Sequence, residues 1–262
     1  MMGPQAAEWT VLGAGAILPQ PDRGCSGYAL SPHAGGQVTL FDCGPGSLRM
    51  LAQTGIELAE VRRVVLSHFH PDHCLDVFAL LFARANPNFD APALEIIGPV
   101  GARELVAGPP GRLARWLPST GVSVHEVTPD RDGQAHWSGD DLELIGAPTE
   151  HTKESLAWRA NTPLDSVTYT GDACEVPAIA ELAAGCDLFV SECSFTDEEA
   201  TPNHLSPSSA ARLATRAGVG ELLLSHFYPG NDPDAAVARA GEVFGGPVRA
   251  ARDGTRLSVG AG

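Results

Sequence analysis

One short segment of the chain gathers four side chains that could do metal chemistry. Residues 67–73 read SHFHPDH and contain the pattern His-x-His-x-Asp-His. Alternate residues of an extended segment point to the same side, so His68 and His70 can bind one cation. Asp72 and His73 follow where the chain turns, and they can reach a second cation. Imidazole and carboxylate groups together suit zinc, so this segment predicts a metal site.

The residues on either side of this segment predict the elements that hold it. The apolar run at residues 64–66 is typical of a buried strand, and apolar residues at 75, 78, 79 and 82 have the spacing of one helix face. Pro71 suits the first turn of a helix, because its missing N–H is not needed there. The four polar groups are therefore expected where a strand ends and a helix begins.

Single polar residues follow other predicted strands and could complete a site for two metal ions. His151, Asp172 and His226 each come at the end of an apolar run, and Asp42 follows a fourth such run. One histidine at a strand end is weak support for a metal site, because such residues are more often ordinary hydrogen-bonded groups. Together with residues 67–73, however, they are consistent with one convergent site.

The apolar patterns along the chain predict strands that alternate with helices. We expect strands at residues 9–12, 27–30, 38–41, 64–66, 94–97, 122–127, 142–146, 156–159, 166–169, 188–190, 222–224 and 248–259, the last as a hairpin that turns at Asp253-Gly254. We expect helices at residues 47–54, 74–84, 100–106, 111–116, 176–184, 207–217 and 233–244, and loops or turns at 85–92, 129–141 and 196–203. This order favours an α/β sandwich of two sheets covered outside by helices. No stretch has the composition of a linker, so residues 1–262 are expected to form a single domain.

Composition and charge narrow the range of partners. With 44% hydrophobic residues, a chain of 262 residues can bury a substantial core. The formal net charge of −15 makes nucleic acid an unlikely partner and disfavours anionic membranes, because both attract a basic surface. The chain shows no signal peptide and no segment of transmembrane length, so we expect a cytoplasmic protein without a membrane partner. The six cysteines form no C-x-x-C pair and are expected to be reduced and mostly buried, with Cys74 and Cys174 close in sequence to candidate ligands.

The ordered set of motifs resembles the metallo-β-lactamase-fold hydrolases, and within them the ribonuclease Z-like branch. The similar segments are DCGPG at residues 42–46, the motif at 68–73, His151, TGD at 170–172 and LSHF at 224–227, which together span most of the chain. The resemblance implies a four-layer αββα sandwich with a two-zinc site at the edge between the sheets.

The resemblance also assigns the candidate ligands to two ions. One zinc takes His68, His70 and His151, the other takes Asp72, His73 and His226, and Asp172 bridges both together with a water or hydroxide. Asp42 is implied to support a motif histidine from behind. The same ligands tolerate Mn²⁺ or Fe in place of Zn²⁺.

A further pair of residues points to acid catalysis. Members of this branch carry a Glu after a late strand and a His before the next helix, and Glu192 and His204 match these positions. The implied role is a relay that protonates the leaving group, since an imidazole oriented by a carboxylate can give a proton to a departing alkoxide. The match departs from the usual His-Ser/Thr-Thr pattern, because Leu205 follows His204, and His204 could instead only cap that helix. Asp72, His204 and Glu192 are the expected catalytic residues.

One feature of transfer-RNA-processing ribonuclease Z is missing from the sequence. That enzyme carries a long arm between the third and fourth motifs, whereas only 20 residues separate His151 from Asp172, and they are typical of two strands with a turn near Pro163. Together with the negative charge, this favours a zinc-dependent phosphodiesterase that acts on a small phosphoester. Three alternatives stay open: a tRNA 3′-processing endonuclease without the usual arm, a lactonase or β-lactamase-type acyl hydrolase, and a binding or regulatory protein that has kept the fold. The expected partner is a small-molecule substrate, and a homodimer is compatible with the resemblance.

Overall fold

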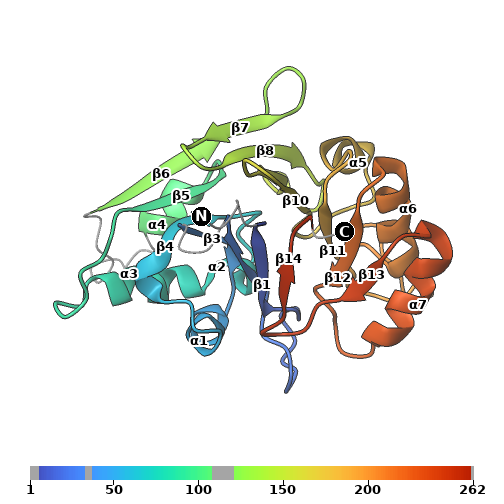
Figure 1. Ribbon diagram of the computed structural model, residues 1–262, viewed down its shortest axis with the longest axis horizontal. Coiled ribbons are helices and arrows are strands. Elements are labelled where there is room, and N and C mark those ends of the chain that lie inside the picture. Colours follow the sequence, from blue (N-terminus) through green and yellow to red (C-terminus); the bar gives the residue numbers. More distant parts are fainter. Residues whose placement is uncertain (1–5, 33–36, 108–120, 261–262) are drawn as a thin grey trace, which may run out of the picture.

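Two seven-stranded sheets form the centre of the protein (Figure 1). The computed structural model describes residues 6–32, 37–107 and 121–260. The first sheet has the order β14-β1-β2-β3-β4-β5-β6, with β1 (Glu8–Gly13), β2 (Gly27–Ser31), β3 (Val38–Cys43), β4 (Val61–Val65), β5 (Leu94–Pro99), β6 (Val122–Val127) and β14 (Arg256–Ser258). The second has the order β13-β12-β11-β10-β9-β8-β7, with β7 (Ala135–Ser138), β8 (Glu143–Pro148), β9 (Leu156–Asn161), β10 (Ser166–Tyr169), β11 (Leu188–Glu192), β12 (Glu221–Ser225) and β13 (Val248–Ala250).

Helices cover the outer face of each sheet (Figure 1). Those beside the first sheet are α1 (Ser47–Gln53), α2 (Pro71–Cys74), α3 (Asp76–Arg84) and α4 (Ala102–Ala107), with a short 3₁₀ helix at Leu58–Glu60. Those beside the second are α5 (Pro177–Leu182), α6 (Pro207–Ala217) and α7 (Pro233–Phe244). Apolar side chains fill the space between each sheet and its helices, and a third core between the sheets contains Trp9, Tyr28 and Trp158. The predicted four-layer αββα sandwich is confirmed.

Local sequence signals set the ends of the helix that follows the candidate acid His204. Ser206 caps α6 by accepting a hydrogen bond from the backbone N–H of Ser209, and Pro207 occupies the first helical position. Gly218 ends the helix at φ 64°, a conformation that glycine adopts without steric cost. Because the helix starts at Pro207, His204 lies in the loop just before it, at the end of the helix that faces the candidate ligands.

Parallel pairing brings several strand ends to one edge of the sandwich. β3, β4, β5 and β6 run parallel in the first sheet, and β10, β11, β12 and β13 run parallel in the second. The carboxyl ends of parallel strands lie on the same edge, so each sheet presents a row of chain turns there. The candidate residues at 42, 67–73, 172, 192 and 226 all lie at or just after such ends.

Buried side chains make three of the hydrogen bonds that join the two sheets close to this edge. They link Tyr28 Oη with Ser225 Oγ (2.6 Å), Trp158 Nε1 with the carbonyl of Leu66 (3.0 Å), and Tyr169 Oη with Asp42 (2.7 Å). All six groups belong to strands or to residues directly beside them, and they are buried. The bonds hold the strand ends of one sheet at a fixed distance from those of the other.

Some predicted elements differ from the structure. The hairpin expected at 248–259 is wrong: the chain turns at Asp253, but β13 and β14 join different sheets. Asp253 explains the separation, because its carboxylate accepts hydrogen bonds from Ala14 and Gly24 and ties the turn to the first sheet. The turn expected at 129–141 contains the edge strand β7, and the motif helix starts at Pro71 and breaks into α2 and α3. The helix expected at 111–116 lies outside the described residues.

Two expectations drawn from composition can be compared with the structure. All six cysteines are free thiols, and Cys43, Cys74, Cys186 and Cys193 are buried, as predicted. Burial raises the pKa of the Cys74 thiol to about 12, so it stays protonated at neutral pH. In the part of the chain that the structure describes, none of the helices has the length and apolar content needed to span a membrane.

Candidate dinuclear metal site

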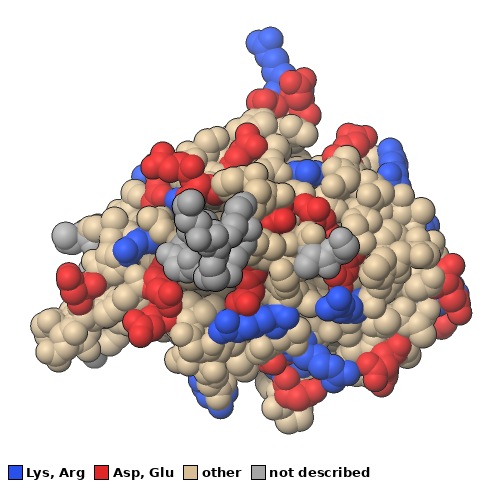
Figure 2. All heavy atoms as spheres, viewed as in Figure 1, with Lys and Arg blue, Asp and Glu red and all other residues tan. Residues whose placement is uncertain are grey.

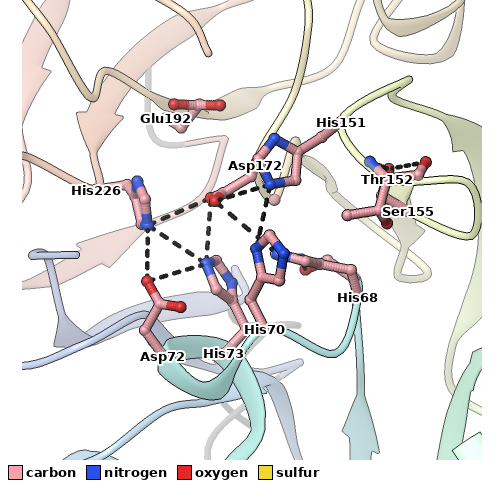
Figure 3. Close-up of polar contacts among 12 residues, drawn as sticks. His68, His70, Asp72, His73, His151, Thr152, Ser155, Asp172, Glu192 and His226 are labelled. Carbon is pink, nitrogen blue, oxygen red and sulfur yellow. Dashed lines mark hydrogen bonds and ion pairs between the residues drawn. The ribbon is translucent and has the colours of Figure 1, made fainter. Parts of the chain in front are cut away.

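The candidate ligands converge at the edge between the sheets (Figure 3). They form groups in which one nitrogen or oxygen atom from every residue lies within 4.8 Å of the others. The first group is His68, His70, His151 and Asp172, the second is Asp72, His73 and His226, and a third, which overlaps both, is Asp172, Glu192, His204 and His226. The structure thus brings together every candidate ligand expected from the sequence, and the first two groups correspond to the two sets that the family resemblance implies.

Asp172 lies between the first two groups and presents a different oxygen to each. Its Oδ1 is 3.1 Å from Nε2 of His73 and 3.3 Å from Nε2 of His226. Its Oδ2 is 3.6 Å from Nε2 of His151 and 3.9 Å from Nε2 of His68. This is the arrangement that a carboxylate bridging two cations needs.

Four of the histidines share one arrangement, in which Nδ1 contacts a protein oxygen and Nε2 faces Asp172. The Nδ1 partners are Asp42 for His73 (2.6 Å), the backbone carbonyl of Asn203 for His151 (2.9 Å), Ser194 for His226 (2.9 Å) and Ser67 for His68 (3.0 Å). A partner on one ring nitrogen fixes the proton there and leaves the other nitrogen with a lone pair for a metal.

Asp42 accepts the hydrogen bonds that orient two candidate ligands of the first sheet, His68 and His73. Its carboxylate accepts hydrogen bonds from the backbone N–H and the hydroxyl of Ser67 (2.8 and 2.7 Å), from Tyr169 and from His73. Because the Ser67 hydroxyl gives its proton to Asp42, its oxygen can only accept from Nδ1 of His68. Asp42 therefore controls the orientation of His73 directly and that of His68 through Ser67.

The first sign that the site fits a metal is a set of nitrogen atoms that face each other. Nε2 of His73 lies 3.3 Å from Nε2 of His226, and Nε2 of His151 lies 3.2 Å from Nδ1 of His70. The protein oxygens already hold the Nδ1 protons of His73, His226 and His151. Lone pairs that approach this closely repel each other unless a cation or a proton lies between them.

An unpartnered atom gives a second sign. Nε2 of His68 is buried and has no hydrogen-bond partner among the described residues. A buried polar atom without a partner costs about 1–3 kcal/mol, which metal coordination would offset. Imidazole and carboxylate groups at this spacing suit a divalent cation, so the residues present fit the group that they were predicted to bind.

The electrostatics of the cluster indicate a shortage of positive charge. Burial alone would lower the pKa of His73, but Asp172 and Asp42 raise it well above its ordinary value. Burial alone would raise the pKa of Asp172, yet His226 and His73 hold it well below its ordinary value. Without a cation, the buried carboxylates thus draw a proton onto His73. A divalent cation would supply that charge and release the imidazole as a ligand.

The two motif histidines of the first group are already in the form that binds metal. Burial lowers the pKa of His68, and the neighbouring His73 lowers it further. Burial and His151 lower the pKa of His70. Both rings are therefore neutral at pH 7, as metal ligation requires.

The chain takes unusual backbone conformations around this cluster. Asp42, Glu150 and His226 have positive φ angles of 54°, 60° and 57°, which residues with a Cβ rarely adopt. Gly171 has φ 57°, and a Cβ there would lie 2.6 Å from Cβ of Ser67, so only glycine lets the two sheet edges meet at this point. Strained residues of this kind concentrate at functional sites.

Glu192 and His204 form a hydrogen-bonded pair beside the second group. Nδ1 of His204 lies 3.0 Å from Oε2 and 3.2 Å from Oε1 of Glu192. Burial alone would lower the pKa of His204, but the hydrogen bond and charge of Glu192 raise it above its ordinary value. The rings of Phe195 and Tyr228 stack with their centroids 4.9 Å apart. Their centroids lie 5.5 and 6.3 Å from that of His204, so aromatic rings pack beside its imidazole.

A cavity of about 390 Å³ lies beside the loop that follows His151. Its walls include Val100, Val127, Pro148 and Leu156, and Lys153 and Glu154 contribute opposite charges. Lys153 is the only lysine in the sequence.

Several residues that shape the site are not identified by the motifs. Ser67, Ser194 and Tyr169 each hold a ligand or a ligand's partner through a hydrogen bond. Ser67 stands next to the His68 motif and could have been noticed there. Ser194 and Tyr169 carry no local signal, because their roles depend on contacts with residues 32 and 127 positions away.

Comparisons with known proteins agree with this geometry. Residues 38–227 match the family model described as beta-lactamase superfamily domain. The chain is 32% identical to ribonuclease Z of Mycobacterium marinum, in an alignment that covers 96% of this chain and 98% of that protein. Among solved structures, it resembles the metallo-beta-lactamase fold protein YhfI from Bacillus subtilis (26% identity, TM-score 0.83, 96% and 99% of the two chains) and the short form of human tRNase Z (22% identity, TM-score 0.79, 96% and 99%).

The family match covers most of the chain, and the mycobacterial relative aligns over almost its whole length. The αββα layers and the histidine-rich strand ends agree with that assignment. The human structure, at 22% identity, supports the fold alone. The chain therefore belongs to the metallo-β-lactamase-fold, metal-dependent hydrolases, as a member of their ribonuclease Z-like branch.

Proposed function

We propose that the protein is a zinc-dependent phosphodiester hydrolase of the ribonuclease Z type, with RNA as its substrate. The sequence alone favoured a small phosphoester and made nucleic acid an unlikely partner. The curated relatives favour the alternative, because the mycobacterial proteins that align over 98% of their length are named ribonuclease Z. The acyl hydrolases receive no comparable support.

The ligands would hold two divalent cations in the first two groups described above. His68, His70 and His151 would bind one ion, Asp72, His73 and His226 would bind the other, and Asp172 would contact both. We propose zinc, because imidazole nitrogens dominate the donor set, while Mn²⁺ or Fe would also suit it. When bound, such a pair supplies a nucleophilic water of lowered pKa and positive charge for the phosphoryl oxygens.

The observation that carries the proposal is the contact between Glu192 and His204. When a phosphodiester is hydrolysed, its leaving group departs as an alkoxide, which needs a proton. The raised pKa of His204 keeps a proton available on this ring. Nδ1 is engaged by Glu192, so Nε2 is the atom that would protonate the leaving oxygen. An acyl hydrolase has less need of this pair. Asp72, whose Oδ2 lies 3.5 Å from Nε2 of His226, would help to orient the nucleophile from the opposite side of the second group.

A small phosphodiester is the second candidate, and three observations favour it. Residues 152–171 form β9, a turn and β10, so they do not provide an RNA-gripping arm. The net charge is −15, and on the face drawn in Figure 2 the basic side chains occur in small groups among acidic ones. Several arginines are also paired with acids, as Arg239 is with Asp197 and Glu242. The cavity beside Lys153 has room for an organic group of modest size.

Cleavage assays separate these candidates. The zinc-loaded protein is offered a precursor tRNA, bis-p-nitrophenyl phosphate and a lactone, at low and moderate salt, with Asp172→Ala as the inactive control. We expect hydrolysis of both phosphodiesters and accurate cleavage of the precursor at the 3′ end of the tRNA. Cleavage of the small diester alone would replace RNA with the second candidate. Hydrolysis of the lactone alone would contradict the phosphodiesterase proposal.

A further inference from the structure

One buried hydroxyl connects the proposed metal ligand His226 with the proposed acid His204. Ser194 follows β11 by two residues and is fully buried. Its Oγ lies 2.9 Å from Nδ1 of His226, 3.2 Å from Nδ1 of His204, and in short contact with Oε2 of Glu192. Three polar groups from different parts of the chain thus meet at one oxygen atom.

The number of protons on these groups determines which atom donates and which accepts in each hydrogen bond. A serine hydroxyl can donate one hydrogen bond and accept two, whereas a carboxylate can only accept. The Ser194 proton therefore goes to Glu192, and Oγ accepts from both imidazoles. His226 and His204 must then each carry a proton on Nδ1.

This direction has a consequence for each ring. With its proton on Nδ1, His226 turns a free Nε2 toward Asp172 (3.3 Å) and Asp72 (3.5 Å), as a metal ligand must. His204 divides its Nδ1 proton between Glu192 and Ser194, which leaves Nε2 for substrate. The same hydroxyl therefore sets the tautomer of a ligand and the orientation of an acid.

We propose that Ser194 is a positioning residue that couples the second metal group to the Glu192–His204 pair. It touches neither substrate nor metal; it acts through His226 and Glu192. The inference rests on the proposed function for the acid and on the ligand assignment for the metal. Among the described residues, Ser194 is the only hydrogen-bond partner found for Nδ1 of His226, so removal of its hydroxyl leaves that nitrogen without a protein acceptor.

Burial explains why solvent would not replace the hydroxyl. Ser194 has no exposed surface, and His226 is only 2% exposed. Glu192, at 1%, would also lose one of its donors and keep the N–H of Ala173 (2.6 Å) and the ring of His204. Loss of the hydroxyl would therefore loosen the metal ligand and the acid together.

The test compares three Ser194 variants with a matched control. Ser194→Ala and Ser194→Cys remove the strong donor and acceptor, the second while keeping the volume of the side chain, and Ser194→Thr keeps the hydroxyl. Ser191→Ala is the control, because Ser191 is also buried and its hydroxyl donates only to the backbone carbonyl of Glu192. The readouts are zinc affinity by competition with a chelating dye, the His226 tautomer by ¹⁵N NMR of the metal-free protein, and hydrolysis of phosphodiesters with poor and good leaving groups.

We expect Ser194→Ala and Ser194→Cys to weaken the binding of one of the two zinc ions by about 10–100-fold, the range found when a ligand's supporting partner is lost. The NMR spectrum should show His226 losing its fixed Nδ1–H form, and hydrolysis should fall more for the poor leaving group. Ser194→Thr should restore all three readouts, and Ser191→Ala should match the wild type. If Ser194→Ala matches Ser191→Ala in zinc affinity and tautomer, the proposal is overturned. If the wild type cleaves no phosphodiester, only the proposed function fails, because zinc affinity and NMR still test the coupling.

Discussion

Oδ1 of Asp172 lies 3.1 Å from Nε2 of His73, at the meeting point of the two sheets. His73 comes from the helix after β4, and Asp172 follows β10 of the other sheet. Their contact joins the two halves of the sandwich through polar groups that are both buried. Such groups need mutual compensation, and the surrounding ligands and a cation would provide it.

The acid role of His204 predicts a loss of rate that depends on the leaving group. His204→Ala should lower kcat by about 10²–10⁴-fold for a diester that leaves as an alkoxide, because the proton donor is gone. The loss should shrink for p-nitrophenolate, which departs without a proton. The metal content, measured in parallel, should equal that of the wild type. An equal loss for both leaving groups would remove His204 from the acid role.

The Glu192–His204 contact predicts a shift of the pH profile. A histidine whose pKa is raised stays protonated to higher pH, and its acid function is lost as pH rises through that raised pKa. Glu192→Gln removes the charge that raises it, so the alkaline loss of kcat should move to lower pH. The profile is measured with an alkoxide-leaving diester. A profile unchanged by Glu192→Gln would mean that Glu192 does not tune His204.

Metal removal should lower the thermal stability of the protein. Without cations, Nε2 of His68 stays buried without a partner among the described residues, and cations that bind only the folded state add about 2.7 kcal/mol of stability when the free metal is at 100 times its Kd. Differential scanning calorimetry with and without a chelator should therefore show a lower Tm for the stripped protein. The Asp172→Ala variant serves as control and should respond much less to the chelator. Equal Tm values for loaded and stripped wild type would contradict the site.

The environment of Asp197 leads us to expect that the stability of the protein falls at low pH. Its carboxylate accepts from Ser206 (2.6 Å) and from the N–H of Ser208 (3.0 Å) and pairs with Arg239 (2.6 Å), which ties the loop before His204 to α6 and α7. Burial alone would raise the pKa of Asp197, but these partners lower it well below its ordinary value. A carboxyl with a lowered folded-state pKa stabilises the protein above its unfolded pKa and loses that effect as pH falls.

Asp197→Asn should therefore reduce the free energy of unfolding by about 1–3 kcal/mol at pH 7, and the difference from wild type should narrow below about pH 4. Urea unfolding at a series of pH values measures this. Glu198→Gln, a change of charge at the exposed neighbouring position, is the matched control and should have little effect. A difference that stays constant from pH 7 to pH 3 would show that the charge of Asp197 is not responsible.

The convergence of the candidate ligands could be predicted from the sequence because the segments that carry them follow apolar strands. His68, Asp172 and His226 all stand just after β4, β10 or β12, and parallel strands place such positions on one edge. The apolar runs that form the strands and the proline that begins the helix at Pro71 are local signals that can be recognised in the sequence. The resemblance to a known family added the expectation of which candidate ligands share an ion.

The parts that could not be predicted depend on contacts distant in sequence. β13 and β14 were expected to pair because a turn joins them, yet each finds a partner in a different sheet, a choice set by the packing of the two sheets. Ser194 has no motif of its own, and its importance becomes visible only when His226 and His204 are placed around it. Likewise, Tyr169 gains a role only through its hydrogen bond to Asp42.

The central claim is that the chain holds two divalent cations that share Asp172. The most direct measurement is elemental analysis of zinc per chain in the wild type, in His151→Ala, in His226→Ala and in Asp172→Ala, all loaded and dialysed alike. We predict about two ions in the wild type, one in each histidine variant, and fewer in Asp172→Ala than in either, because Asp172 faces both groups. A wild type without metal, or an Asp172→Ala variant that retains two ions, would contradict the account.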